Sequence, residues 1–236
     1  TAAAREKGIG VTNVQGYCAE DLADYVLAAV FHFYKGLTEY QSRLQNGAWG
    51  AQAVERLPKR ISQSTLLIVG CGRIGLTVAK LCQSLGMKII GYDPDRDAAF
   101  LNEQGVEKVS LEEGLRLGDY VSVNVRLDES TTGLLGEREF SLMKKGAYLI
   151  NTARGAVLKE DELIRALETG VIAGAVLDVI THEPPREHEP IFSAPNCIVT
   201  PHVSYISQES FEELRGRATW NAIKMLRGEQ PADLVN

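Results

Sequence analysis

Short apolar runs alternate with helical patterns along most of the chain. Helical segments lie between several of the runs, among them Glu137–Met143 and Lys159–Thr169. Strands that are apolar on both faces and alternate with helices are typical of a parallel sheet covered on both sides. The pattern predicts an α/β fold, a doubly wound parallel sheet of about seven strands. The strand candidates are Leu66–Val69, Met87–Tyr92, Val106–Val109, Tyr120–Val125, Ala147–Asn151, Val171–Leu177 and Cys197–Thr200.

The two ends of the chain follow other patterns. Residues 1–17 indicate the end of a short helix and then a strand. From Ala19 to Leu44, apolar residues recur at helical spacing on one face, which predicts one long helix that serves the core or a subunit contact. Residues 45–63 lack periodicity and are interpreted as an arm or linker. Ser207–Arg227 is predicted to be a charged amphipathic helix.

The stretch Ser64–Asp93 is the most informative part of the pattern. It reads as strand, glycine turn, helix and strand, and the turn has the spacing G-x-G-x-x-G at Gly70, Gly72 and Gly75. The first glycine permits a tight turn, the second lets the backbone approach a pyrophosphate, and the third lets helix and strand pack closely. The helix start offers N–H groups and a positive dipole end to phosphates. A dinucleotide site is predicted here, and a purely structural turn is the alternative.

An acid ends the second strand of this stretch. Asp93 follows Gly75 by 18 positions, where a carboxylate can accept hydrogen bonds from the adenosine ribose. Because a carboxylate repels a 2′-phosphate, the sequence predicts NAD rather than NADP. Arg96 is close enough to blur that preference, although a solvated surface charge is its simpler interpretation.

Composition narrows the class of protein. The 236 residues are 44% hydrophobic and 24% charged, with a net charge of −6 and no basic run, so a nucleic-acid partner is not expected. The longest apolar stretch is too short for a membrane span, and no signal peptide is visible. Four scattered cysteines without a C-x-x-C pair indicate free thiols in a reducing, cytoplasmic location.

Three side chains at predicted strand ends could carry chemistry, because ligands of such sheets bind at the carboxyl ends of the strands. Arg154 in INTARG could hold a carboxylate with two parallel hydrogen bonds, or be an ordinary surface arginine. His202 in VTPHVS could be a general acid or base. Glu183 in THEPP could stabilise the imidazolium of His202 and orient its ring. Taken singly, His202 and Glu183 also fit structural and exposed-loop roles.

Other chemistries are disfavoured. The segment His182–Pro190 (HEPPREHEP) holds two histidines and two glutamates, but it lacks a helical H-E-x-x-H and is broken by prolines, so no metal site is predicted. No serine-hydrolase G-x-S-x-G and no P-loop motif occurs in the sequence.

Several blocks of the chain follow one another in an order that is specific to one family. They are GIGVTNVQGY, LLIVGCGRIG with Asp93, LMKKGAYLINTARGAVLKEDELIRAL, GAVLDVITHEPP, PNCIVTPHVSY and GEQPADLVN. On these blocks, from about Gly8 to Asn236, the chain resembles the D-isomer-specific 2-hydroxyacid dehydrogenases. The resemblance implies that Arg154, Glu183 and His202 are catalytic. It also implies NAD contacts from the glycine turn with Arg73 and Ile74, and from Asp93, Val125, Thr152, Ala153, Asp178 and His202.

The resemblance also implies a domain layout, and the chain departs from the family's usual pattern in three respects. Residues 1–18 would end a flavodoxin-like substrate domain, 19–204 would form the NAD-binding Rossmann domain, and 205–236 would return to the substrate domain. About seventy to a hundred residues of the substrate domain would precede Thr1. Arg126 stands where the family often has proline, as a second cleft cation or a harmless change, and Ile180 replaces a common aromatic residue.

The leading hypothesis is an NAD-dependent enzyme that transfers hydride between NAD(H) and a 2-hydroxy acid/2-keto acid pair. The stretch TPHVSYISQESFEELR is most similar to the C-terminal-binding-protein subgroup, which motivates the alternative of an NAD(H)-sensing dimeric binding protein. A methyl-donor-binding Rossmann domain is a third reading, but it needs no arginine–glutamate–histidine set. The apolar helix 19–44 and the following arm predict a homodimer.

Overall fold

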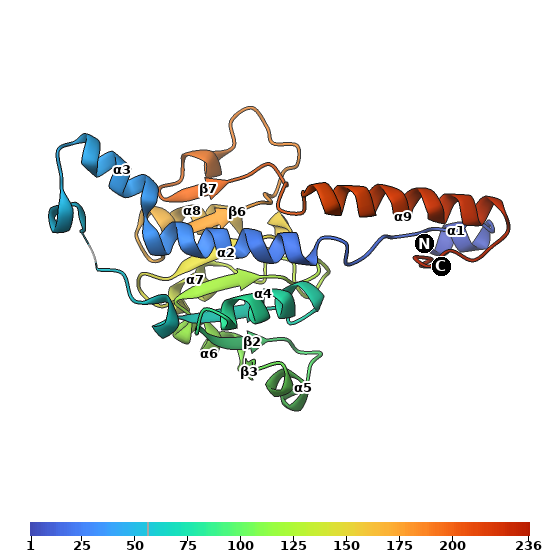
Figure 1. Ribbon diagram of the computed structural model, residues 1–236, viewed down its shortest axis with the longest axis horizontal. Helices are drawn as coiled ribbons and strands as arrows, with labels where there is room; N and C mark the ends of the chain where they lie inside the picture. Colours follow the sequence, from blue (N-terminus) through green and yellow to red (C-terminus); the bar gives the residue numbers. More distant parts are fainter. Residues whose placement is uncertain (56) are drawn as a thin grey trace. The chain divides into compact units, whose positions relative to one another are not determined.

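Seven parallel strands form one sheet, in the order β3-β2-β1-β4-β5-β6-β7 (Figure 1). The chain runs outward from β1 to β3, returns to β4 beside β1, and continues outward to β7. Neighbouring strands run in register, as in the pairing of Leu66 with Ile89 and with Tyr120. This order confirms the predicted doubly wound α/β fold. The strands are β1 Thr65–Val69, β2 Lys88–Tyr92, β3 Glu107–Lys108, β4 Tyr120–Val123, β5 Tyr148–Asn151, β6 Gly174–Leu177 and β7 Cys197–Val199.

The computed structural model describes residues 1–55 and 57–236. They form two compact units: Leu22–Ser204, which contains the sheet, and Thr1–Asp21 with Tyr205–Asn236. The helices of the first unit are α2 Ala19–Lys35, α3 Leu37–Gln45, α4 Arg73–Gln83, α5 Ala98–Glu103, α6 Leu111–Leu117, α7 Glu137–Leu142 and α8 Glu160–Glu168. Its short 3-10 turns are η1 Gly50–Ala53, η2 Ile61–Gln63, η3 Gly155–Val157 and η4 Pro190–Ser193.

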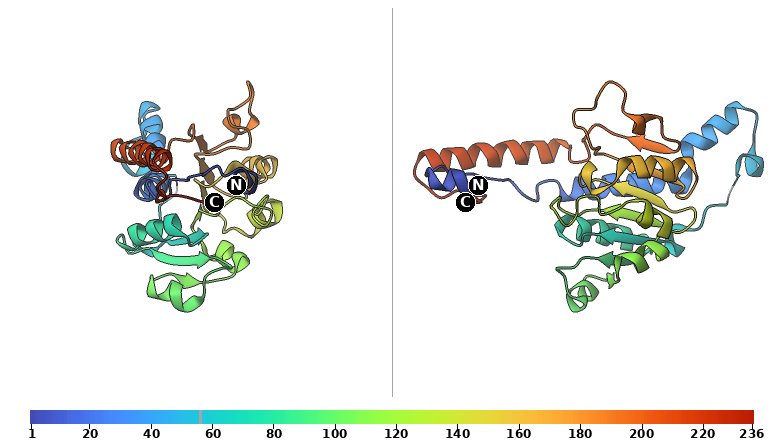
Figure 2. Two further views of the ribbon diagram at one scale, coloured as in Figure 1. Left: turned by 90° about the vertical axis from the view of Figure 1, so that its right-hand side faces the viewer. Right: turned by 180° about the vertical axis from the view of Figure 1, so that it is seen from behind.

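Each face of the sheet has its own hydrophobic core. Successive strand residues point to opposite faces, so Leu66 and Ile68 join one core while Leu67 and Val69 join the other. Helices α2, α4 and α5 cover the first face, and α6, α7 and α8 cover the second (Figure 2). Coverage on both sides explains why the strands are apolar at nearly every position.

Two expectations for the first 63 residues are corrected. The helix predicted over 19–44 is two helices, because Gly36 between α2 and α3 adopts a left-handed conformation with φ of 55°. The strand predicted before residue 17 is reduced to a single bridge between Thr12 and Leu234. The short turns η1 and η2 lie within residues 45–63, whose interpretation as an arm or linker stays a prediction.

The second unit consists of α1 Ala2–Glu6, α9 Gln208–Leu226 and the segments beside them. Arg217 on α9 pairs with Asp233 at 2.5 Å, and Asn221 donates a hydrogen bond to the same carboxylate at 2.7 Å. Inside α9, only Ser210 and Asn221 are buried. This unit is therefore held by polar contacts more than by an apolar core. Within the described residues, no helix has both the length and the apolar character to cross a membrane.

Candidate active site

The glycine turn between β1 and α4 is shaped by close backbone contacts. Gly70 has φ of +94°, and a Cβ there would lie 2.8 Å from the Val125 backbone nitrogen. A Cβ on Gly75 would lie only 2.1 Å from the Gly70 carbonyl oxygen, whereas Gly72 has nothing within 4 Å. The two outer glycines thus close the turn, and the middle one leaves the space through which a ligand can approach.

The start of α4 is open to an anion. Gly72 is the N-cap, and no side chain caps this helix. Arg73 and Ile74, the first two helical residues, follow directly. Uncapped N–H groups with the helix dipole behind them form a phosphate site. Burial raises the pKa of the Cys71 thiol to about 12, with the charge of Asp93 adding to the effect, so the thiol stays neutral beside this site.

Asp93 is anchored beside the same turn. Its Oδ2 accepts the Cys71 N–H at 2.8 Å, and its Oδ1 accepts the Asp95 N–H at 2.9 Å. The carboxylate therefore has a fixed position just past the end of β2. Arg96 lies over the Phe100 ring, with its guanidinium carbon 5.1 Å from the ring centroid, so this cation has a partner of its own.

Unpaired buried oxygens occur where the strand order reverses. Val125 lies against Gly70 just past β4, and Thr152 and Ala153 follow β5. In the described part of the chain, Asn124 Oδ1 and Thr152 Oγ1 are buried without a hydrogen-bond partner. Such atoms are rare in native proteins, and the crevice at the reversal of strand order is where sheets of this kind bind ligands. The residues present at this edge fit a dinucleotide.

Arg154 is held by the turn that follows β5. The Asn151 side chain brackets this turn, donating to the Arg154 carbonyl at 3.0 Å and accepting the Ala153 N–H at 3.0 Å. A Cβ on Gly155 would lie 2.0 Å from the carbonyl carbon of Ile180, so the turn touches the backbone that leads to Glu183. The exposed Arg154 guanidinium donates to the Ala153 carbonyl at 2.6 Å. Within residues 1–55 and 57–236 the guanidinium makes no further hydrogen bond or ion pair, so its other donors are available to a substrate.

Glu183 and His202, which are 19 residues apart, come together. Glu183 Oε2 lies 2.7 Å from Nδ1 of His202. The other oxygen, Oε1, accepts the Ile180 N–H at 3.0 Å. The glutamate is therefore fixed at one oxygen and orients the imidazole with the other. Because Nδ1 faces the glutamate, proton exchange with a substrate would take place at Nε2.

Asp178 holds the backbone around His202. Its buried carboxylate accepts hydrogen bonds from the N–H groups of Val203 and Ser204 at 2.9 and 2.8 Å and from the Thr200 hydroxyl at 2.6 Å. His202 has φ of 55°, a conformation that costs energy in a non-glycine residue. Asp178, which the resemblance assigned to the nicotinamide, thus has a clear structural role as well.

Two supporting residues, Tyr25 and Thr200, are not identified from the sequence as parts of the site. Tyr25 falls within the helix predicted over 19–44, and Thr200 ends a predicted strand. The Tyr25 hydroxyl lies 2.5 Å from the Thr200 hydroxyl, which in turn donates to Asp178. Burial raises the pKa of the Tyr25 phenol. Because no local pattern links residues 175 positions apart, this network cannot be predicted from the sequence.

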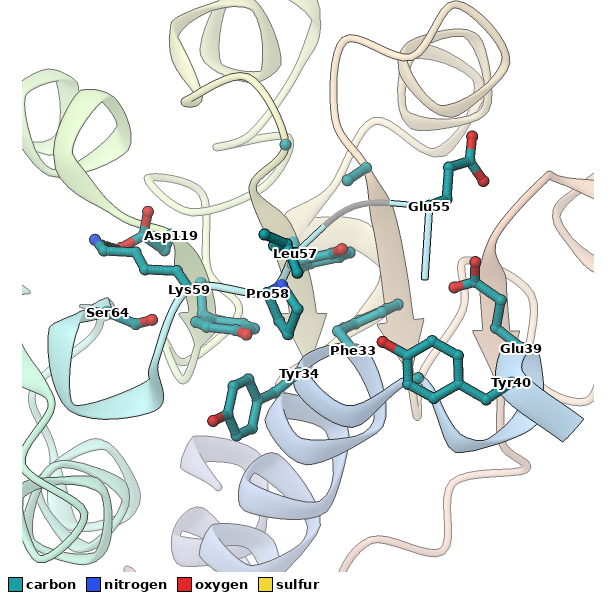
Figure 3. A pocket seen from close by; sticks show the side chains of 15 residues that line it. Phe33, Tyr34, Glu39, Tyr40, Glu55, Leu57, Pro58, Lys59, Ser64 and Asp119 are labelled. Atoms are coloured by element: carbon teal, nitrogen blue, oxygen red, sulfur yellow. Dashed lines mark hydrogen bonds and ion pairs between the residues drawn. The ribbon is translucent and has the colours of Figure 1, made fainter. Parts of the chain in front are cut away.

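A separate cavity of about 480 Å³ lies at the amino-terminal ends of the strands, away from the candidate site (Figure 3). It is lined by Phe33 and Tyr34 of α2, Tyr148 of β5, and the segment containing Leu57 and Lys59. Phe33 stacks on Tyr148 with ring centroids 4.1 Å apart.

Across residues 1–55 and 57–236, no cluster of three or more His, Cys, Asp or Glu side chains is arranged to hold a metal ion.

The fold and the glycine turn define a dinucleotide-binding domain of the Rossmann type. Comparison with known proteins defines the family. Residues 27–204 match the model of the D-isomer specific 2-hydroxyacid dehydrogenase NAD binding domain. A glyoxylate reductase from Korarchaeum cryptofilum is 37% identical over 99% of this chain and 71% of its own length. A hydroxypyruvate reductase from Blautia hydrogenotrophica is 31% identical over 99% of this chain and 73% of its own length.

Similarity to solved structures points to the same family. The D-lactate dehydrogenase of Aquifex aeolicus, complexed with NAD and lactic acid, superposes with a TM-score of 0.88 and 31% identity over 97% of this chain and 72% of that one. The chain belongs to the D-isomer-specific 2-hydroxyacid dehydrogenase family. It is an NAD-dependent oxidoreductase that transfers hydride between NAD(H) and a 2-hydroxy acid/2-keto acid pair. The comparisons give no support to the alternative of an NAD-sensing binding protein.

Proposed function

We propose that Arg154, Glu183 and His202 carry the reaction. Arg154 binds the substrate carboxylate and polarises the adjacent carbonyl group. His202 donates a proton from Nε2 to the carbonyl oxygen during reduction and takes it back during oxidation. Glu183 orients the ring and stabilises its protonated form. The observation that carries this proposal is the 2.7 Å contact between Glu183 Oε2 and His202 Nδ1.

The bound cofactor supplies the hydride, and the residues of this chain hold the cofactor in position. The backbone at Gly70, Gly72, Arg73, Ile74 and Gly75 holds the pyrophosphate. Asp93 accepts hydrogen bonds from the adenosine ribose, while Val125, Thr152 and Ala153 line the path toward the nicotinamide. Asp178 and His202 lie at its reactive end. This division of labour makes positioning the main contribution of the protein.

The substrate is a small 2-keto acid. The relatives are named for glyoxylate and hydroxypyruvate, and the structural neighbour holds lactic acid. These compounds share a carboxylate beside the reacting carbon, which is what an arginine near a proton donor can recognise. Arg126, whose side chain is 88% exposed and 4.0 Å from Asp128, could serve a second anionic group on a larger substrate.

Turnover tests the catalytic assignment. NADH oxidation is followed with glyoxylate, hydroxypyruvate and pyruvate, using the full-length protein. His202→Ala is expected to lower kcat by about 10²-fold or more, the usual contribution of a general acid. His188→Ala, at an exposed histidine of a nearby loop, is the matched control. No turnover by the wild type, or equal rates for His202→Ala and wild type, would exclude the assignment.

The enzyme is a homodimer whose subunits meet through residues 19–44, which form α2 and most of α3, and through the arm, of which the structure describes residues 45–55 and 57–63. Neither α3 nor η1, which lies in the arm, contains a buried residue. Leu37, Trp49 and Leu57 expose 73%, 78% and 85% of their surface, which a second copy would cover. Sedimentation equilibrium at micromolar concentration is expected to give a dimer, and Trp49→Asp is expected to weaken it. Leu117→Asp, at an exposed leucine outside the arm, is the control, and a monomeric wild type would refute the proposal.

The residues outside the sheet unit belong to the substrate domain, in the layout of 1–18 and 205–236 around a Rossmann domain of 19–204. The polar packing of α9 supports this, because a helix with so few buried residues needs a further partner.

A cytoplasmic location is proposed from the four free cysteines. Fractionation of cells with a thiol-labelling readout tests the location, and disulfide-linked protein would contradict it.

A further inference from the structure

Glu189 is a buried acid in an otherwise solvent-accessible loop. Of residues 181–190, all of which the structure describes, it is the one that is buried, with 4% of its side chain exposed. Glutamate is rarely buried to this extent without a partner, because removing a carboxylate from water has a free-energy cost that only good pairing offsets. The catalytic scheme proposed above does not use this residue, so its burial needs another explanation.

The partners of Glu189 flank Glu183 in the sequence. Glu189 Oε1 accepts the Arg186 N–H at 2.9 Å. The same oxygen lies 3.4 Å from Nδ1 of His182. That nitrogen is buried, although 38% of the side chain is exposed, and it makes no hydrogen bond among the described residues, so Glu189 is its ion-pair partner. His182 immediately precedes Glu183, and Arg186 follows it by three positions. One carboxylate therefore ties both sides of the short segment that presents Glu183.

The position of Glu183 decides the orientation of His202. Glu183 has a single protein anchor for Oε1, the Ile180 N–H, while Oε2 contacts the imidazole. Its side chain is one-third exposed, so packing alone does not fix it. General acid catalysis requires the donor within hydrogen-bond reach of the substrate, and a shift of about 1 Å can cost 10²-fold in rate.

We infer that Glu189 is a positioning residue: by pairing with His182 and accepting the Arg186 N–H, it holds the loop 181–190 in the shape that places Glu183 against His202. This inference rests on the proposed roles of Glu183 and His202. In this role Glu189 does not contact the substrate or the cofactor. Glu189 affects catalysis only through the position of Glu183.

The test separates the charge of Glu189 from its shape. Glu189→Gln keeps the size of the side chain and an acceptor for the Arg186 N–H, but removes the charge that pairs with His182. It is expected to lower kcat by about tenfold, a fraction of the general-acid contribution, while the Kd for NADH stays unchanged. Glu187→Gln, an exposed acid of the same loop, is the matched control and is expected to behave as wild type.

A double-mutant cycle shows the route of the effect. If Glu189 acts through Glu183, Glu189→Gln lowers kcat in the wild type but adds nothing in the Glu183→Gln background, because the coupled residues are not additive. His182→Gln, with His188→Gln as its control, is expected to reproduce the loss and covers the case in which the Glu189 variant folds poorly. All measurements use the full-length protein with NADH and glyoxylate.

The outcomes are distinct. Equal kcat for Glu189→Gln and Glu187→Gln, or an undiminished effect of Glu189→Gln in the Glu183→Gln background, overturns the inference. The proposed function fails separately if Glu183→Gln itself leaves kcat unchanged. A loss of kcat with Glu189→Gln and His182→Gln that disappears without Glu183 supports the inference.

Discussion

At the scale of single residues, two of the three glycines of the turn, Gly72 and Gly75, are needed for different physical reasons. Gly75 is confined by backbone, since its missing Cβ would stand 2.1 Å from the Gly70 oxygen and 2.9 Å from Ile68 Cγ2. A backbone neighbour cannot rotate away as a flexible side chain can. Gly72 is unconfined within the protein and has an ordinary φ of −79°, so its lack of a side chain serves the ligand.

Alanine at these two positions is therefore expected to separate stability from binding. Gly75→Ala should destabilise the fold by about 3 kcal/mol or more, through overpacking against backbone. Gly72→Ala should keep the wild-type Tm but weaken NADH binding by about tenfold, equivalent to about 1.4 kcal/mol. Thermal unfolding and a fluorescence titration measure the two effects. A Gly72→Ala protein that binds NADH normally would contradict the assignment of the open space to the pyrophosphate.

Asp93 sets cofactor choice at the same scale. Both carboxylate oxygens are anchored by backbone N–H groups, so its charge cannot swing away from a 2′-phosphate. Asp93→Ala is expected to reduce the preference for NADH over NADPH, measured as the ratio of kcat/KM values, by about tenfold or more, a shift of at least about 1.4 kcal/mol. Asp95→Ala, an exposed acid two positions away that keeps its N–H, should leave the ratio unchanged.

At the scale of elements, the residues that follow β6 fix the backbone conformation of His202, which follows β7. The backbone N–H of His202 donates to the Asp178 carbonyl at 2.9 Å, and the Asp178 carboxylate takes the next two N–H groups. These bonds offset the cost of the left-handed backbone at His202. The strand ends thus supply the site with pre-formed geometry as well as with side chains.

Asp178→Asn is expected to damage both stability and turnover. An amide presents one acceptor where the carboxylate presents two, and its NH₂ group would face an N–H donor. The unfolding free energy should fall by about 2–4 kcal/mol, the range for breaking a buried charged hydrogen-bond network. Denaturant unfolding and kcat for glyoxylate measure the outcome. Wild-type stability in this variant would show that the network contributes little.

At the scale of the whole sheet unit, Asp119 joins three parts of the chain at the amino-terminal ends of the strands. It accepts hydrogen bonds from Lys59 at 2.9 Å, Lys144 at 2.7 Å and the Thr65 N–H at 2.9 Å. Burial by itself would raise the pKa of the Asp119 carboxyl, but the hydrogen bonds from Lys144, Lys59 and Thr65 outweigh it and hold the pKa below its ordinary value of 3.8.

This depressed pKa gives a pH-dependent contribution to stability. Because the folded state holds the proton less tightly than the unfolded state, the contribution is complete above about pH 5 and declines as the pH falls below the ordinary value of 3.8 toward the folded pKa. The destabilisation by Asp119→Asn should therefore be larger at pH 7 than at pH 3. Urea unfolding at the two pH values tests this, with Glu129→Gln at an exposed site as control. A pH-independent difference would assign the effect to packing.

Much of the fold could be predicted from local sequence. The seven apolar runs became the seven strands, and the glycine turn was located with its acid, because strand burial and turn sterics depend on neighbouring residues. The short helices α5 and α6 were not identified. Each begins with a side-chain cap, at Asp97 and Ser110, and is too brief to show a periodic pattern.

The sequence by itself determined which chemical groups this protein possesses and in what order: a glycine turn, an acid after β2, and an arginine, a glutamate and a histidine after later strands. Only the tertiary structure decided how those groups are held. The Tyr25–Thr200–Asp178 network and the pairing of Glu183 with His202 depend on segments far apart in the sequence meeting at one edge of the sheet. Such contacts join residues that no local period connects, so they exist only after the chain has folded.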